Sequence, residues 1–147
     1  MTQRSLSVLI LCTGNSARSQ MAEALLRQLS DGRVDVVSAG SAPQPHVHPM
    51  AVATLQSEFG IDTTGLHPKS LSQFLGRHFD YVITVCDRAA EACPVFPGAP
   101  ERIHWSFEDP AAVKNDNQRR RAFEQVAAGL TDRLRSWLAL PKVQSRL

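Results

Sequence analysis

The stretch VLILCTGNSARS, from Val8 to Ser19, determines how this chain begins to fold. Its first four residues, Val8–Leu11, form an apolar run that is typical of a buried parallel strand. The residues from Ser19 to Leu29 are interpreted as a helix. The loop between them would direct several backbone N–H groups, and the positive end of the helix, at whatever lies above Cys12. We therefore predict a strand–loop–helix unit with a thiol at its centre.

The loop has the residues expected of a nucleophile inside an oxyanion cradle. A thiol in the field of a helix N-terminus loses its proton readily, so we expect a lowered pKa for Cys12 and an attacking thiolate. Arg18 supplies a planar charged fork for two oxygens of a tetrahedral anion, and Gly14 and Asn15 tolerate left-handed backbone. The residues expected to hold the anion are Thr13, Gly14, Asn15, Ser16, Ala17 and Arg18. The alternative is a buried cysteine at the end of a core strand.

Length and composition indicate one globular domain spanning residues 1–147. Hydrophobic residues make up 43% and charged residues 20%, which is ordinary for a soluble globule. The net charge of +2 is too small to indicate a nucleic-acid partner, and no apolar stretch is long enough to span a membrane. Residues 1–7 lack the shape of a signal peptide. We therefore expect a cytoplasmic protein whose three cysteines are reduced.

The rest of the chain alternates strands with helices, without an internal repeat or a linker. Strands are predicted over residues 34–39, 81–85 and 102–105, and helices over residues 49–59, 70–75 and 123–138, the last ended by Pro141. The basic run Arg119–Arg121 is expected at the solvated start of a helix. This alternation favours a single α/β domain with a four-stranded parallel sheet and helices on both faces. Because ligands bind such sheets at the carboxyl ends of the strands, the position of Cys12 fits a binding site.

The other two cysteines lie after the third predicted strand. Cys86 follows that strand directly, so adjacent parallel strands would bring it to the same edge of the sheet as Cys12. Cys93 comes seven residues later, across a segment (87–92) that could form about two helical turns. In a regular helix their Cα atoms would be about 10 Å apart, so a disulfide requires the segment to unwind. The two cysteines are either a redox switch or a buried, idle pair.

Asp109 precedes Pro110 in a loop just past the fourth predicted strand. A carboxyl group at this edge of the sheet could protonate the oxygen that leaves a bound oxyanion, and the alternative is an ordinary Asp-Pro turn. His46 and His48 lie in a proline-rich loop, with no Cys or carboxylate at ligand spacing. We therefore interpret both histidines as surface residues and expect neither a metal site nor a cofactor.

Together these residues resemble the low-molecular-weight tyrosine phosphatase superfamily and, within it, the thioredoxin-coupled arsenate reductases. The similarity runs from Leu6 to about Leu138. It covers the phosphate loop (Cys12–Ser19), the redox segment (Cys86–Pro97) and the acid loop HWSFEDP (His104–Pro110). The resemblance implies a phosphatase-like α/β fold, arsenate as the substrate, thioredoxin as the electron donor and a role in arsenic resistance.

The resemblance also implies a role for each catalytic residue. Cys12 attacks arsenate held by the loop, Asp109 protonates the departing oxygen, and Ser19 steadies the thiolate through a hydrogen bond. Cys86 then attacks Cys12 and releases arsenite. Finally Cys93 attacks Cys86, which leaves a disulfide that thioredoxin reduces.

Two alternative functions share some of these residues. A low-molecular-weight tyrosine phosphatase needs neither Cys86 nor Cys93, but such enzymes carry aromatic residues after the Asp-Pro pair, where this chain has Ala111 and Ala112. A non-catalytic sensor would bind arsenite or a metal ion through three thiols, which leaves Arg18 without a purpose.

One branch of the reductases also holds a potassium ion near the loop. The residues that match its ligand positions are Asn15, Glu23 and Ser38. Pro68 and Ser70 stand where that branch has Thr and Asp, and Lys69 between them could supply a charge in the place of the ion.

Overall fold

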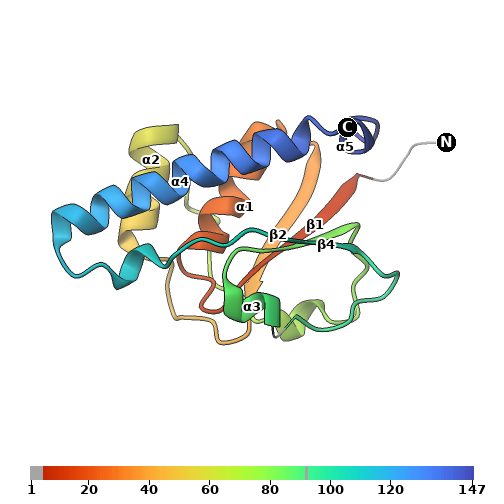
Figure 1. The fold of residues 1–147 in the computed structure, drawn as a ribbon, viewed down its shortest axis with the longest axis horizontal. Helices are drawn as coiled ribbons and strands as arrows, with labels where there is room; N and C mark the ends of the chain where they lie inside the picture. Colours follow the sequence, from red (N-terminus) through yellow and green to blue (C-terminus); the bar gives the residue numbers. More distant parts are fainter. Residues whose placement is uncertain (1–4, 92) are drawn as a thin grey trace.

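Four parallel strands form the centre of the structure, a computed structural model that describes residues 5–91 and 93–147. The strands are β1 (Leu6–Cys12), β2 (Val34–Gly40), β3 (Tyr81–Thr84) and β4 (Glu101–His104), in the spatial order β2-β1-β3-β4 (Figure 1). Every neighbouring pair is parallel. The predicted four-stranded parallel sheet is confirmed. The prediction that residues 1–7 lack the shape of a signal peptide falls partly outside the structure, because residues 1–4 lie outside the described residues.

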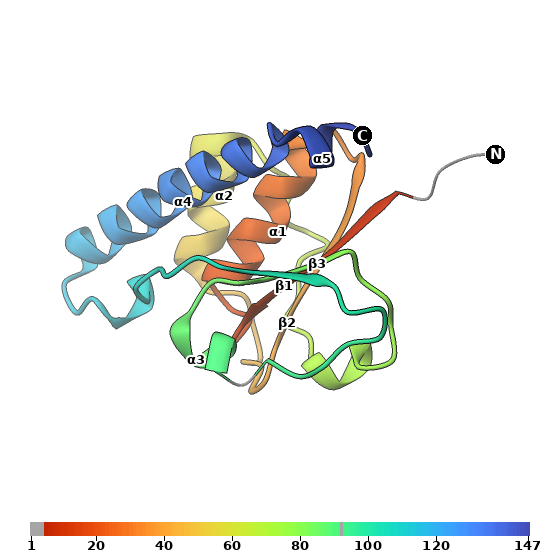
Figure 2. The same cartoon turned by 45° about the vertical axis from the view of Figure 1, so that its right-hand side comes forward.

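Helices cover both faces of this sheet. The longer ones, α1 (Arg18–Leu29), α2 (Pro49–Phe59) and α4 (Asp116–Leu138), lie together on one side, and the short α3 (Asp87–Glu91) lies on the other (Figure 2). The remaining elements are α5 (Pro141–Gln144) and two 3-10 turns, η1 (Leu71–Phe74) and η2 (Pro110–Ala112). In the described part of the chain, no helix is long and apolar enough to cross a membrane.

Besides shifts of one or two residues at the ends of strands and of α1, three helical predictions differ from the structure. The helix expected over residues 70–75 is the single turn η1, which Ser70 caps by accepting from the Ser72 N–H (3.2 Å). Helix α4 starts before its apolar stripe, at a cap supplied by Asn115, and its polar first turns contain Arg119–Arg121 as expected. Pro141 begins α5 rather than ending α4, because proline suits the first turn of a helix.

The apolar stripe of α4 fixes the helices to the sheet. Phe123, Leu130 and Leu134 are fully buried, and α4 packs against α1, which in turn packs against β1 and β2. Burying one such side chain contributes about 1.5–3 kcal/mol. The residues Val8–Ile10 of β1 are also fully buried. Packing in the core therefore fixes the position of Cys12, which ends this strand.

The strand order brings the ends of β1 and β3 side by side. After β1 the chain continues to β2 on one side of this central pair, and after β3 it continues to β4 on the other side. The loops that follow β1 and β3 therefore run apart at the carboxyl ends of these two strands. Cys12 ends β1, and Cys86 follows the end of β3 by two residues. As predicted, both thiols lie at the same edge of the sheet.

Candidate active site

The loop after β1 bonds its carbonyl groups to the rest of the chain and leaves its N–H groups free. Three carbonyls accept from N–H groups of the segment 41–48: Thr13 from Ala42 (3.0 Å), Gly14 from Gln44 (2.8 Å) and Ser16 from His48 (2.9 Å). Among the described residues, no backbone carbonyl accepts from the N–H groups of Gly14–Ala17. Asn15 has a φ of 48°, a left-handed conformation that asparagine tolerates. These free donors fit the predicted anion cradle.

Gly40, at the end of β2, allows this close packing. A Cβ atom on Gly40 would overlap the carbonyl oxygen of Thr13 in the loop. Only glycine therefore fits at this place without displacing the loop. The sequence predicts only a strand that ends at residue 39, just before Gly40, because nothing local shows which segment approaches this glycine.

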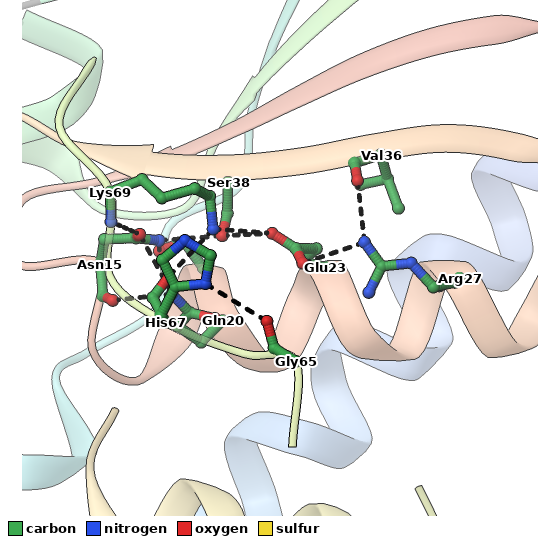
Figure 3. A network of polar contacts seen from close by, with 10 residues as sticks. Asn15, Gln20, Glu23, Arg27, Val36, Ser38, Gly65, His67 and Lys69 are labelled. Atoms are coloured by element: carbon green, nitrogen blue, oxygen red, sulfur yellow. Dashed lines mark hydrogen bonds and ion pairs between the residues drawn. The ribbon is translucent and has the colours of Figure 1, made fainter. Parts of the chain in front are cut away.

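A buried polar network behind the loop holds Asn15 in place (Figure 3). Its Nδ2 donates to Ser19 Oγ (2.8 Å) and Ser38 Oγ (2.9 Å), and its Oδ1 accepts from the Lys69 N–H (2.8 Å). Asn15, Ser19 and Ser38 are fully buried, and none of them lines the cavity in front of the loop. Ser19 Oγ accepts from Asn15 and so supports the loop, and its own proton is left to donate. The expected hydrogen bond from Ser19 to the Cys12 thiolate stays a prediction.

Glu23 of α1 brings a negative charge into this network. Its Oε1 accepts from Ser38 Oγ (2.7 Å) and lies 3.5 Å from Lys69 Nζ, and its Oε2 pairs with Arg27 at 3.0 Å (Figure 3). The side chains of Glu23 and Lys69 are only 6% and 11% exposed. The structure thus places the Lys69 ammonium beside Glu23, as the sequence suggested.

An open cavity of about 880 Å³ lies in front of the loop. Its wall joins four segments of the chain, 12–18, 42–48, 86–88 and 106–111, and it includes Cys12, Arg18, Cys86, Asp87, Phe107 and Asp109. Arg18 Nη1 donates to the Phe107 carbonyl (2.7 Å), whereas Arg18 Nε is buried without a partner in the described part of the chain. An unpaired buried donor is costly unless a ligand accepts from it. An oxyanion bound in the loop would supply that acceptor.

The thiols of Cys12 and Cys86 are hydrogen-bonded to each other. The bond from Cys12 lowers the pKa of Cys86 to about 5, with further help from Thr13, whose Oγ1 lies 3.5 Å from Cys86 Sγ. The same bond, together with burial, raises the pKa of Cys12, although Arg18 opposes this. The two thiols therefore share one proton, and the pair holds one thiolate near neutral pH. The expected low pKa of Cys12 did not consider this second thiol and stays a prediction.

Cys93 lies apart from this pair. It is partly buried, it does not line the cavity, and burial raises the pKa of its thiol. Helix α3 covers residues 87–91 of the predicted helical segment, and residue 92 lies outside the described residues. Beyond Cys93, Phe96 is buried against Phe79, with ring centroids 5.9 Å apart. All three cysteines are free thiols.

Asp109 forms a turn and lines the cavity at the same time, and its role as the acid stays a prediction. Its Oδ1 accepts from the Ala111 N–H (3.0 Å) and caps η2, as in an ordinary Asp-Pro turn. Asp109 also lines the cavity, together with Phe107, whose carbonyl binds Arg18. The hydrogen bond from Arg18 thus joins the acid loop directly to the loop after β1, Cys12–Ser19, which is called the anion loop below.

His48 is a cavity residue that the sequence interpretation missed. Its side chain lines the cavity and packs on Phe123, with ring centroids 4.7 Å apart, whereas His46 is exposed. The prediction of a surface position was therefore wrong for His48. A signal was present, because the residue before a proline that starts a helix is an N-cap position. His48 precedes Pro49 there, and its Nδ1 accepts from the Met50 N–H (3.0 Å).

Comparison with known proteins gives consistent matches. Residues 7–146 match the family described as low molecular weight phosphotyrosine protein phosphatase. An arsenate reductase of Halalkalibacterium halodurans is 37% identical over 131 residues, which cover 88% of this chain and 93% of the relative. A thioredoxin-dependent arsenate reductase of Corynebacterium glutamicum superposes with a TM-score of 0.77 at 28% identity, covering 100% of this chain and 66% of that one. An arsenate reductase in a phosphate-binding state gives a TM-score of 0.72 at 31% identity, covering 91% and 97%.

Proposed function

Because this chain belongs to the low molecular weight phosphotyrosine protein phosphatase family and is similar to arsenate reductases, we propose that it reduces arsenate to arsenite. The observation that carries the proposal is the hydrogen-bonded pair of thiols, Cys12 and Cys86, in the wall of a cavity with free oxyanion donors. A phosphatase uses a single thiol at this place. Transfer of two electrons to arsenic uses a second thiol that attacks the first.

In the first step, arsenate accepts from the free N–H groups of the loop and from Arg18 Nε. The Cys12–Cys86 pair holds one proton, and its transfer along their hydrogen bond leaves the thiolate on Cys12. Cys12 Sγ attacks arsenic and forms a sulfur–arsenic bond, while one arsenate hydroxyl group takes a proton from Asp109 and leaves as water. The anion loop is already in place for this step.

In the second step, Cys86 loses its proton to the arsenic-bound oxygens and attacks Cys12 Sγ. The sulfur–sulfur bond forms as the sulfur–arsenic bond breaks, and the bonding electron pair stays on arsenic, which departs as arsenite. The two thiols already interact in the free protein and line the same cavity, so Cys86 lies on the side from which it attacks Cys12.

In the third step, Cys93 attacks Cys86 and releases the Cys12 thiolate. Cys86 lies just before α3 and Cys93 lies two residues beyond its end, so we infer that this helix unwinds to bring the two sulfurs together. This helix has only five residues and depends on tertiary contacts, whereas Phe96 stays anchored on Phe79. The product is a Cys86–Cys93 disulfide. The segment between the two cysteines has to move before this disulfide can form.

We infer that thioredoxin reduces this disulfide. Val95, two residues after Cys93, is 87% exposed and offers an apolar contact to a dithiol protein. The Corynebacterium glutamicum protein with a similar fold is thioredoxin-dependent. A relay of free thiols also suits the reducing environment of the cytoplasm, where we place the protein.

The two alternative functions are less well supported. Cys12, Arg18 and Asp109 suffice for slow phosphate-ester hydrolysis, which we expect only as a side activity. A three-thiol sensor would need its cysteines together, but Cys93 lies outside the cavity. Within residues 5–91 and 93–147, no three His, Cys, Asp or Glu side chains gather where they could hold a metal ion.

Three cysteine variants test the relay in quenched single-turnover assays with mass mapping of disulfides. Cys12→Ser should lose both arsenate reduction and phosphatase activity, and Cys86→Ser should lose only the reduction. Cys93→Ser should release about one arsenite per enzyme and then stall with Cys12 bonded to Cys86. The donor is tested by comparing turnover with thioredoxin and with glutaredoxin. Unimpaired arsenate reduction by Cys86→Ser would refute the proposal.

A further inference from the structure

His48 lies beside the anion loop and is held there by contacts on three sides. Its backbone N–H donates to the Ser16 carbonyl (2.9 Å), which joins the start of α2 to the loop. Its ring packs on the fully buried Phe123, with an angle of 34° between the ring planes. The same side chain lines the cavity that contains Cys12 and Arg18. The imidazole is therefore fixed in the wall of the proposed active site.

The cap that His48 forms determines which ring nitrogen carries a proton. Its Nδ1 accepts from the Met50 N–H (3.0 Å), so this nitrogen is unprotonated. Burial and the charge of Arg119 lower the pKa of His48, although Asp109 opposes this, so the ring is neutral at pH 7. A neutral imidazole with an accepting Nδ1 carries its proton on Nε2. In the described part of the chain, nothing accepts a hydrogen bond from this Nε2–H.

We propose that the Nε2–H of His48 donates a hydrogen bond to the oxyanion held by the loop. This proposal rests on the proposed function, because it assigns a further binding residue to the same site. The N–H groups of the loop and Arg18 approach the anion from one segment, and His48 adds a neutral donor from the start of α2. The cap on Met50 and the packing on Phe123 fix its orientation, so little conformational freedom is lost when the anion binds.

The variant His48→Asn separates the two roles of this residue. Asparagine is a strong N-cap, so Asn at this position keeps the bond to the Met50 N–H but lacks a donor at the position of Nε2. The matched control is His46→Asn, because His46 lies in the same loop, is exposed and does not line the cavity.

We expect His48→Asn to weaken the binding of inorganic phosphate, measured by calorimetry, by about ten-fold or more, because the lost bond is to a charged group. The KM for arsenate should rise in parallel, while wild type and His46→Asn remain alike. Equal phosphate affinity of His48→Asn and wild type would overturn the role of His48. If wild type itself neither binds phosphate nor reduces arsenate, the proposed function fails as well.

A measurement on the wild-type protein keeps the proposal testable if the variant folds poorly. The ¹⁵N resonance of His48 Nε2 should shift when phosphate saturates the site, while Nδ1 keeps the shift of an unprotonated acceptor. A merely structural histidine would show no such response. An unchanged Nε2 resonance at saturating phosphate would refute the proposal.

Discussion

At the scale of single residues, the hydrogen bond between Cys12 and Cys86 makes the acidity of each thiol depend on the other. The first proton leaves easily because the resulting thiolate keeps a thiol donor beside it. The second leaves with difficulty because it would place two negative sulfurs in contact. The pair therefore stores one thiolate near neutral pH, and the position of one proton decides which sulfur attacks.

Replacing Cys86 with alanine should lower the pKa of Cys12. The hydrogen bond to Cys86 is the largest cause that raises this pKa, and its loss leaves Arg18 and the Thr13 N–H to favour the Cys12 thiolate. The measurement is the pH dependence of iodoacetamide modification at Cys12, followed by mass spectrometry in wild type and in Cys86→Ala. In the wild-type protein, modification near pH 6 should occur within the pair Cys12 and Cys86, because the thiolate that they share forms with a pKa of about 5. Identical pH midpoints for Cys12 in both proteins would contradict the coupling.

Asp109→Asn should slow the chemical step by roughly 10²–10⁴-fold, because asparagine keeps the shape of the side chain but has no transferable proton. The cap on η2 should persist, since the amide oxygen of asparagine accepts the Ala111 N–H equally well. Phosphate affinity should therefore change little. Single-turnover arsenite release, measured beside a phosphate titration, separates the two effects. Turnover near the wild-type value would mean that another group acts as the acid, and Glu108 would be the first residue to test.

At the scale of elements, side chains of the edge strand β4 contact the redox segment (Cys86–Pro97) at two places, one before Cys93 and one after it. His104 Nε2 lies 2.8 Å from Asp87 Oδ1 at the start of α3, and Arg102 Nη2 donates to the Pro94 carbonyl (2.7 Å) just beyond Cys93. Arg102 and His104 are two residues apart on a strand, so both side chains project from the same face. The segment that must rearrange in the third step is therefore fastened to a rigid sheet.

Loosening the Asp87 end of this attachment should speed the third step. His104→Ala removes a partly exposed pair, so we expect formation of the Cys86–Cys93 disulfide to accelerate by about two- to five-fold. The rate is measured by rapid quenching of the Cys12–Cys86 intermediate. Lys142→Met is the matched control, because Lys142 pairs with Glu101 of the same strand and does not touch the redox segment. A rate unchanged from wild type, or slower, would show that this pair does not restrain α3.

At the scale of the whole molecule, the network around Glu23 ties together α1, β2, the anion loop and the segment 65–70 (Figure 3). Lys69→Met should lower the free energy of unfolding by about 1–3 kcal/mol, because it removes one partner from a buried carboxylate that keeps Arg27. Denaturant unfolding measures the change. Lys142→Met breaks an exposed pair and should have no measurable effect. Equal losses in the two variants would mean that the burial of Glu23 does not matter.

The parts of this molecule that could be predicted from the sequence are those with a local signal. Burial is indicated by three local patterns: the apolar run before Cys12, the β-branched strand before Cys86 and the apolar stripe of α4. The sheet and its helices could be predicted from these patterns. The bond from Asn15 to Ser38, the proton shared by the thiol pair and the place of His48 depend on contacts between segments more than 20 residues apart. No local pattern records such contacts. The sequence therefore located the site but not its hydrogen-bond network.

The bonds between the anion loop and the segment 41–48 also bear on how so small an ion can be recognised. A tetrahedral oxyanion has five heavy atoms and buries little surface, so its binding yields little free energy with which to order a flexible chain. Because the loop carbonyls are already bonded in the free protein, the conformational entropy of the loop is lost during folding, when the core compensates for it. Association then costs mainly the translational freedom and hydration of the ion. The stability of the fold is in this sense the source of the affinity of the site.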